Sequence, residues 1–178
     1  MRNKALIVVV SAAMVLGGLA AAGPAQAATT GGTPVTIQVT GGALNISVPA
    51  GPVSLGSVSA SSSAQTVSAS LGTVSVTDGR GGTAGWVATA SGVAFTGPQT
   101  ISVSATGLSS YTATTASVVG TAVVADTDLD ALSPGGVVQT ATGVVGINSA
   151  TWSPTISVTV PANALAGTYS STITHSVS

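Results

Sequence analysis

The sequence predicts an all-β fold: a single antiparallel β-sandwich of the immunoglobulin-like or Greek-key type, following a cleaved export signal. Three observations favour this fold. Apolar and polar residues alternate with a period of two through most of the chain after residue 33, and helical periodicity is nearly absent. Glycine- and proline-rich turns separate the short runs, which is typical of sandwiches or partly open barrels. Aromatic residues make up only 3% of the chain, so the core must consist of Val, Ile, Leu and Ala.

The N-terminus has the pattern of a secretory signal. Arg2 and Lys4 provide a positive start, an apolar run follows, and Ala25-Gln26-Ala27 gives a small-x-small cleavage site. The apolar run contains glycines and is shorter than the roughly 20 residues that cross a bilayer. We therefore expect a secreted protein with no membrane span after cleavage. The expected organisation is a signal peptide over 1–27, a linker over 28–33 and one domain over 34–178.

The first expected strand covers residues 34–40, where Val35, Ile37 and Val39 lie on one face. Gly41-Gly42 is suited to a tight hairpin that leads into the run of Leu44, Ile46 and Val48. Gly72 interrupts a later run and indicates a bulge. The remaining expected strands contain the alternating residues of 67–71, 74–76, 86–90, 101–105, 156–160 and 169–177.

Two segments break the alternation. Ser59–Ala64 is a serine cluster and is expected to form a loop. Ala122–Thr142 is expected to be a long irregular stretch, and a connection of this length usually has short structure of its own or a function. Within it, Asp126 or Asp128 could cap one helical turn that reaches Leu132.

The charge and cysteine content exclude several classes of function. After residue 27 the chain has one Lys or Arg residue, Arg80, and four aspartates. It therefore lacks the cations that neutralise nucleic-acid phosphates or attract anionic lipids. The chain contains no cysteine, so no disulfide can stabilise the exported fold. Low charge also reduces repulsion between copies, which makes a homo-oligomer possible.

The turn from Asp78 to Trp86 contains most of the candidate ligand-binding residues. Trp86 could stack on a sugar ring, with Asp78 and Arg80 as polar contacts beside it. Alternatively, Trp86 and Trp152 each fill the core of a domain that has few large side chains. Asp78 and Arg80 are expected to pair in a wide hairpin loop, where an exposed ion pair would add little stability.

His175 is the only histidine and completes the set of candidate ligand-binding residues. It alternates with Ile173 and Val177, which favours a packed position or one at the rim of a sheet. The sequence has no Gly-x-Ser-x-Gly nucleophile elbow. We therefore expect a protein that is not an enzyme.

Asp126, Asp128 and Asp130 alternate as the carboxylates of calcium loops do. Three converging carboxylates would repel one another, and a bound Ca²⁺ would relieve that repulsion. The EF-hand pattern is incomplete, because Ala131 and Val137 stand where it requires glycine and glutamate. The alternatives are an irregular calcium site or a solvated acidic loop, and no other cofactor is expected.

The run from Val76 to Ser91 resembles the first signature of WxL-domain proteins, which are cell-surface modules of Gram-positive bacteria. The run from Trp152 to Val177 is similar to the ending of that domain, and residues 53–58 are similar to its early segment. The resemblance covers nearly the whole predicted domain. The chain departs from the family at the two namesake motifs, which read Trp86-Val87-Ala88 and His175-Ser176-Val177.

The resemblance implies non-covalent attachment to peptidoglycan and participation in surface complexes. We therefore expect a secreted, cell-wall-associated protein, a diverged member of actinobacterial type, whose partners are cell-wall glycan or other surface proteins. The alternative is a structural surface protein that assembles with copies of itself or with other proteins. Its nearly uncharged Ser/Thr surface lacks the lysines that usually protect edge strands. A calcium-stabilised adhesive module is a further alternative.

Overall fold

The computed structural model describes residues 30–178, so the predicted signal peptide lies outside the described residues. The chain divides into two units, Met1–Ile37 and Gln38–Ser178, and the described part of the first unit contains no strand. The nine strands found within residues 30–178 all belong to the second unit. The predicted all-β, antiparallel fold is confirmed for the described residues. Among them there is no helix that could span a membrane.

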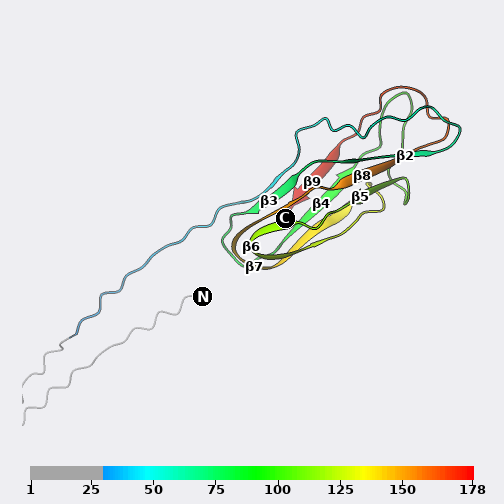
Figure 1. The fold of residues 1–178 in the computed structure, drawn as a ribbon. Coiled ribbons are helices and arrows are strands. Elements are labelled where there is room, and N and C mark those ends of the chain that lie inside the picture. The colour runs from blue at the N-terminus through cyan, green and yellow to red at the C-terminus, as the bar shows by residue number, and fades with distance from the viewer. Residues whose placement is uncertain (1–29) are drawn as a thin grey trace, which may run out of the picture. The chain divides into compact units, whose positions relative to one another are not determined.

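The strands form two antiparallel sheets (Figure 1). The six-stranded sheet contains β1 (Leu44–Ser47), β3 (Val74–Asp78), β4 (Trp86–Gly92), β6 (Ser117–Asp126), β7 (Gly136–Trp152) and β9 (Ile173–Val177). Its order is β1–β3–β7–β4–β9, and β6 also pairs with β7. The three-stranded sheet contains β2 (Gln65–Ser70), β5 (Ser109–Thr112) and β8 (Thr155–Val160) in the order β2–β8–β5.

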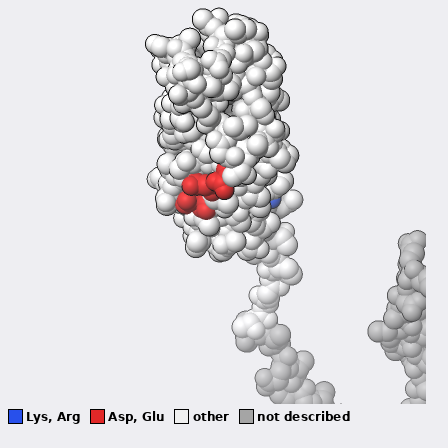
Figure 2. Space-filling model, turned by 90° about the vertical axis from the view of Figure 1, so that its right-hand side faces the viewer, with Lys and Arg blue, Asp and Glu red and all other residues white. Residues whose placement is uncertain are grey.

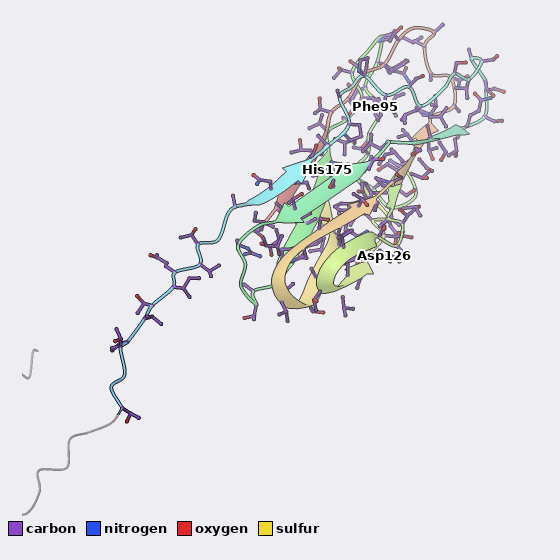
Figure 3. All side chains as sticks on the ribbon, turned by 60° about the vertical axis from the view of Figure 1, so that its left-hand side comes forward. Phe95, Asp126 and His175 are labelled. Atoms are coloured by element: carbon purple, nitrogen blue, oxygen red, sulfur yellow. The ribbon has the colours of Figure 1, made fainter. Side chains whose placement is uncertain are left out.

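The 17-residue strand β7 organises the larger sheet. Its residues 136–141 pair with β4, its residues 148–152 pair with β3, and β6 also pairs along its length. Between these two halves β7 curves round one end of the domain (Figure 3). Gly143 and Gly146 have φ angles of 60° and 74° there, which glycine adopts without the strain that a side chain would cause. The curve brings β1 near β9 without pairing them, so the sheet is nearly closed.

One apolar core receives side chains from both sheets. Buried positions alternate with partly or fully exposed ones along β3, and with partly exposed ones along β4, as their sequence predicts. β8 contributes the buried residues Ile156 and Val158, and the connection between β4 and β5 contributes Ile101 and Val103. The other buried apolar residues are Val74, Val76, Trp86, Ala88, Ala90, Tyr111, Ala113, Leu132, Val138, Ala141, Val144, Ala150 and Trp152.

The predicted first strand and its hairpin are wrong. Residues 34–40 form no strand, although their apolar residues alternate. Gly41-Gly42 does not turn the chain, because the Gly42 N–H donates to the Gly79 carbonyl at 2.6 Å and extends the β1–β3 ladder. A Cβ at Gly41 would collide with the carbonyl group of Arg80. These glycines therefore allow the backbone to lie close to residues 79 and 80, and they do not form a tight turn.

Several other expectations are corrected. Gly72 is not a bulge but part of the connection between β2 and β3, which belong to different sheets. Residues 101–105 form only an isolated bridge, from Ile101 to Phe95. In the final run only Ile173–Val177 is a strand. Most of the stretch 122–142 belongs to β6 and β7, and the connection between them contains no helical turn.

We expect Gly85→Ala to destabilise the fold. A Cβ at Gly85 would collide with the Ala141 carbonyl oxygen, and overpacking of this kind costs about 1–3 kcal/mol. Gly82→Ala is the matched control, because nothing lies within 4 Å of a Cβ there. The free energy of unfolding from urea titration measures the effect. Equal stabilities of the two variants would contradict the packing of the 79–85 loop on β7.

Candidate functional site

The Asp78 carboxylate is the centre of a buried hydrogen-bond network, and its side chain is only 2% exposed. Oδ1 accepts from the Arg80 backbone N–H at 3.1 Å and from Arg80 Nε at 2.9 Å. Oδ2 accepts from Arg80 Nη2 at 2.9 Å and from Asn148 Nδ2 at 3.4 Å. Asp78 and Asn148 are directly opposite each other in the β3–β7 ladder. Hydrogen bonds from Arg80 hold the pKa of Asp78 below its usual value.

The same network fixes Trp86 and the loop that precedes it. Trp86 Nε1 donates to Asn148 Oδ1 at 3.0 Å, and the indole is 2% exposed. Arg80 Nη2 also donates to the carbonyl oxygens of Ala84 and Gly85, at 3.2 and 2.9 Å. The interpretation of Trp86 as a core residue therefore agrees with the structure. A sugar cannot stack on its indole in this conformation, because the ring is covered.

The predicted setting of Asp78 and Arg80 needs correction as well. The pair forms as expected, but the loop is not a hairpin, because β3 and β4 both pair with β7 and not with each other. The carboxylate is also buried instead of exposed. The Gly82 carbonyl accepts from the Gly146 N–H at 2.9 Å, so the loop is attached to the curve of β7. Its role in the structure is to hold that curve.

His175 belongs to a second buried network. Trp152 Nε1 donates to the Tyr111 hydroxyl oxygen at 2.9 Å, and that hydroxyl lies 3.1 Å from His175 Nε2. The indole N–H can only donate, so the single hydroxyl hydrogen is available to Nε2, which accepts it when the imidazole is neutral. Burial raises the pKa of Tyr111 to about 12 and lowers the pKa of His175. Both groups are therefore neutral at pH 7.

The three aspartates proposed for calcium gather on one face of the molecule, as Figure 2 shows. Asp128 Oδ1 accepts from the Ala113 N–H at 2.8 Å, and Asp126 Oδ1 accepts from the Thr115 hydroxyl at 3.3 Å. Asp126, Asp128 and Asp130 are exposed to solvent. Within residues 30–178, no group of three His, Cys, Asp or Glu side chains is arranged to hold a metal. Two of the three carboxylates are thus hydrogen-bonded to neighbouring protein groups, and the choice between a calcium site and a solvated acidic loop stays a prediction.

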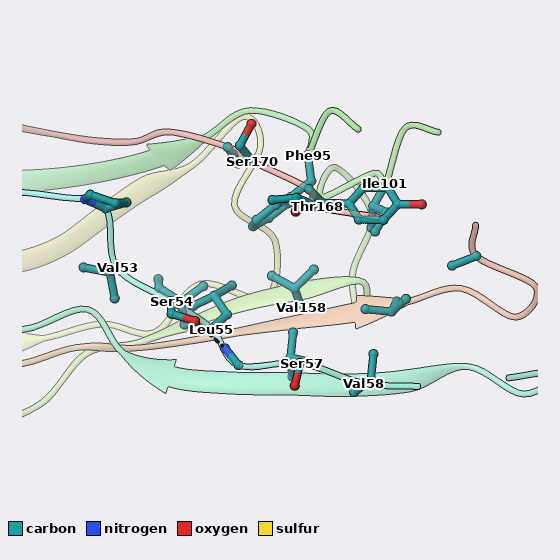
Figure 4. Close-up of a pocket in the computed structure, with 18 of the residues that line it drawn as sticks. Val53, Ser54, Leu55, Ser57, Val58, Phe95, Ile101, Val158, Thr168 and Ser170 are labelled. Atoms are coloured by element: carbon teal, nitrogen blue, oxygen red, sulfur yellow. Dashed lines mark hydrogen bonds between the residues drawn. The ribbon is translucent and has the colours of Figure 1, made fainter. Parts of the chain in front are cut away.

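A large groove, which the sequence did not predict, is lined by residues of β2, β8 and β9 and by irregular segments next to them (Figure 4). Its volume is about 890 Å³. One wall is the irregular segment 48–61, and the facing wall is the irregular segment 164–172. Apolar side chains line it: Leu55 and Leu165 from the two walls, Val158 from β8, and Phe95 from the connection between β4 and β5. Among the residues that line the groove, His175 is the only one whose side chain ordinarily titrates near neutral pH.

The wall formed by 48–61 is weakly attached to the rest of the domain. Outside strand pairing, its single backbone–backbone hydrogen bond to the described residues joins the Ser61 carbonyl to the Asn163 N–H at 2.7 Å. Val53 and Val58 on this wall remain 38% and 41% exposed. The groove is therefore bordered by backbone groups that a further extended segment could pair with.

The structure places the sequence-predicted site residues in three separate locations. Asp78, Arg80 and Trp86 lie together in the first network, His175 lies at the groove, and the three aspartates lie in the acidic loop. Sequence reasoning missed Asn148 and Tyr111, whose roles depend on partners 70 and 64 residues away. Comparison with protein-family models, with curated proteins and with solved structures found no match to this chain.

We expect Asp78→Asn to lower the free energy of unfolding by about 1–3 kcal/mol, because an amide NH₂ would face the donors of Arg80 and Asn148 and leave them unsatisfied. Asp130→Asn is the matched control, since that carboxylate is exposed. Its effect should stay within about 0.5 kcal/mol, as for ordinary surface substitutions. Urea titration at pH 7 provides the measurement. Similar values for both variants would show that the network contributes little.

The lowered pKa of His175 predicts pH-dependent stability. Below the ordinary histidine pKa of 6.5 the unfolded chain takes up a proton that the folded chain resists. The free energy of unfolding should therefore decrease from pH 7.5 to pH 5.5, and the decrease should end once the pH is below the lowered pKa. His175→Gln can still accept the Tyr111 hydrogen but does not titrate, so its stability should stay level over this range. A level profile for the unsubstituted protein would contradict the assignment.

Proposed function

We propose that this chain is a secreted, non-catalytic surface protein that binds an extended apolar segment of a protein partner in the groove between residues 48–61 and 164–172. The observation that carries the proposal is the groove itself. It has a volume of about 890 Å³, is open to solvent and is lined mainly by aliphatic and small side chains. Ligand sites are typically concave, apolar and largely preformed.

The chemistry of the lining favours binding over catalysis. Nε2 of His175 is occupied by the Tyr111 hydroxyl, and no carboxylate is among the residues that line the groove. A catalytic histidine usually needs a nucleophile within reach and a group that orients its ring. The two walls instead present backbone groups and apolar side chains, which are the features by which proteins recognise extended peptides.

The proposal also covers the location and the finer fold. The export signal and the resemblance to WxL domains support attachment to the envelope of a Gram-positive bacterium. A core shared by two antiparallel sheets supports a sandwich of immunoglobulin-like type. We assign the binding surface to the groove and not to the Trp86 loop, because the Trp86 indole is buried. Another surface protein therefore fits better as partner than a glycan that stacks on Trp86.

We expect Leu165→Asp to release the protein from the envelope into the medium. Leu165 lines the groove and is 56% exposed, so the substitution should be compatible with folding, and a carboxylate there would be desolvated by an apolar ligand. Val119→Asp is the matched control, because Val119 is 70% exposed on β6 and is not part of the groove. The measurement is the fraction of each exported variant in the envelope of the secreting bacterium. Equal retention of both variants would contradict the proposal.

A further inference from the structure

Residues 34–40 resemble a strand that lacks a partner. Val35, Ile37 and Val39 alternate with Thr36, Gln38 and Thr40. The three apolar side chains are 89%, 92% and 89% exposed, and they are the most exposed of the large apolar residues described. An extended segment with one apolar face is stable only when it joins a sheet or packs on an apolar surface. The segment thus has the chemistry of a strand that completes another structure.

The chain around Gly41 and Gly42 prevents this segment from pairing with the neighbouring strand β1. The Gly42 N–H donates to the Gly79 carbonyl, and the Gly79 N–H donates to the Ala43 carbonyl at 2.9 Å. These bonds continue the line of β1 past its first residue, so the backbone does not fold back along the free edge of β1. A hairpin at Gly41-Gly42 would have to break both bonds.

The groove offers the surface that such a segment requires. Within residues 30–178, β1 pairs only with β3 and β9 pairs only with β4. The unpaired edges of β1 and β9 lie near each other at the place where the sheet is not closed. The groove lies next to this opening, since Val48 and Ile173 are among its lining residues. An added strand could place alternate side chains against the accessible lining residues Leu55, Phe95 and Leu165. Strand addition of this kind combines backbone hydrogen bonds with pockets for every second side chain.

Residues 34–40 of a second copy are an occupant that this chain itself supplies, and their chemistry matches the groove. The segment 34–40 and the groove lining contain no Asp, Glu, Lys or Arg, so no charged side chain from either would lose its hydration when they come into contact. The donor segment and the acceptor groove also occur once each in every chain. A contact between two different surfaces of identical chains joins copies head to tail and can continue into rings or filaments.

We infer that residues 34–40 of one copy bind as an added strand in the groove of a second copy. This inference rests on the proposed function of the groove and specifies the partner. Val35, Ile37 and Val39 face the groove, and Thr36, Gln38 and Thr40 face outward. Because the contact contains no ion pair, its affinity should depend little on ionic strength.

The natural absence of cysteine allows a direct test by disulfide cross-linking. The chain beginning at residue 28 is prepared as two single-cysteine variants, Ile37→Cys and Leu55→Cys. The two variants have affinity tags of different length, so that a dimer containing one of each can be recognised by its size. Their oxidised mixture should yield the mixed-tag dimer, because the two sulfurs belong to different copies. Val119→Cys replaces Leu55→Cys in the control mixture, and its mixed dimer should be at least about tenfold less abundant, since Val119 is accessible but outside the groove.

Light scattering over a range of concentrations adds a second readout. Ile37→Asp should shift the protein to monomers, because its carboxylate would enter an apolar groove. Gln38→Asp introduces the same charge on the outward face and should still associate. At concentrations where all proteins are monomeric, thermal unfolding should be the same in both variants, because residues 37 and 38 lie outside all strands.

Three outcomes would overturn the inference: a monomer at every concentration, equal effects of Ile37→Asp and Gln38→Asp, or a cross-link to Val119 as abundant as that to Leu55. A cross-link favouring Val119 would place the contact on β6 instead. If Leu165→Asp releases the protein from the envelope while Ile37→Cys and Leu55→Cys fail to cross-link, the groove function stands and the second copy is excluded as its occupant. If the cross-link forms but Leu165→Asp is retained, assembly stands and envelope binding uses another surface.

Discussion

The buried carboxylate of Asp78 is the constraint on which the larger sheet depends. It receives hydrogen bonds from the backbone and guanidinium of Arg80 and from Asn148. Through Arg80 it holds the 79–85 loop, and through Asn148 it connects β3 to β7 and to the indole of Trp86. A buried charge is tolerated only when such partners surround it. The hydrogen bonds that attach the 79–85 loop and Asn148 of β7 to β3 therefore converge on one acidic side chain.

The two indoles show how a core without disulfides and with few aromatic residues acquires a unique arrangement. Each tryptophan supplies a large apolar surface, and each has one N–H that must be paired when buried. Trp86 donates to Asn148 and Trp152 donates to Tyr111, so the two networks fix the two largest side chains in specific orientations. Small aliphatic residues fill the remaining space. Directional hydrogen bonds thus provide a specificity that Val and Ala alone do not.

The parts of the fold that the sequence could predict are those with regular alternation. Val74, Val76, Ala88 and Ala90 are buried as their period indicates. The stretch 122–142 was not recognised as strand, because β7 curves at glycines and its burial pattern changes side at the curve. The exposure of Trp86 could not be decided either, since it depends on Asn148, which is 62 residues away. The groove was missed because its walls, 48–61 and 164–172, are irregular and have no period to detect.

The failure of one sequence prediction has a structural explanation with consequences for assembly. Residues 34–40 alternate like a strand, yet the two glycines that could turn them back onto β1 are used to approach the backbone of residues 79 and 80. The Asp78–Arg80 pair holds that backbone, so the contacts of the two glycines belong to the same network as the 79–85 loop. Strand propensity without an intramolecular partner is usually selected against, because exposed apolar strands aggregate. Because the same chain also has an uncharged apolar groove, the segment is most simply explained if it has a partner on another molecule.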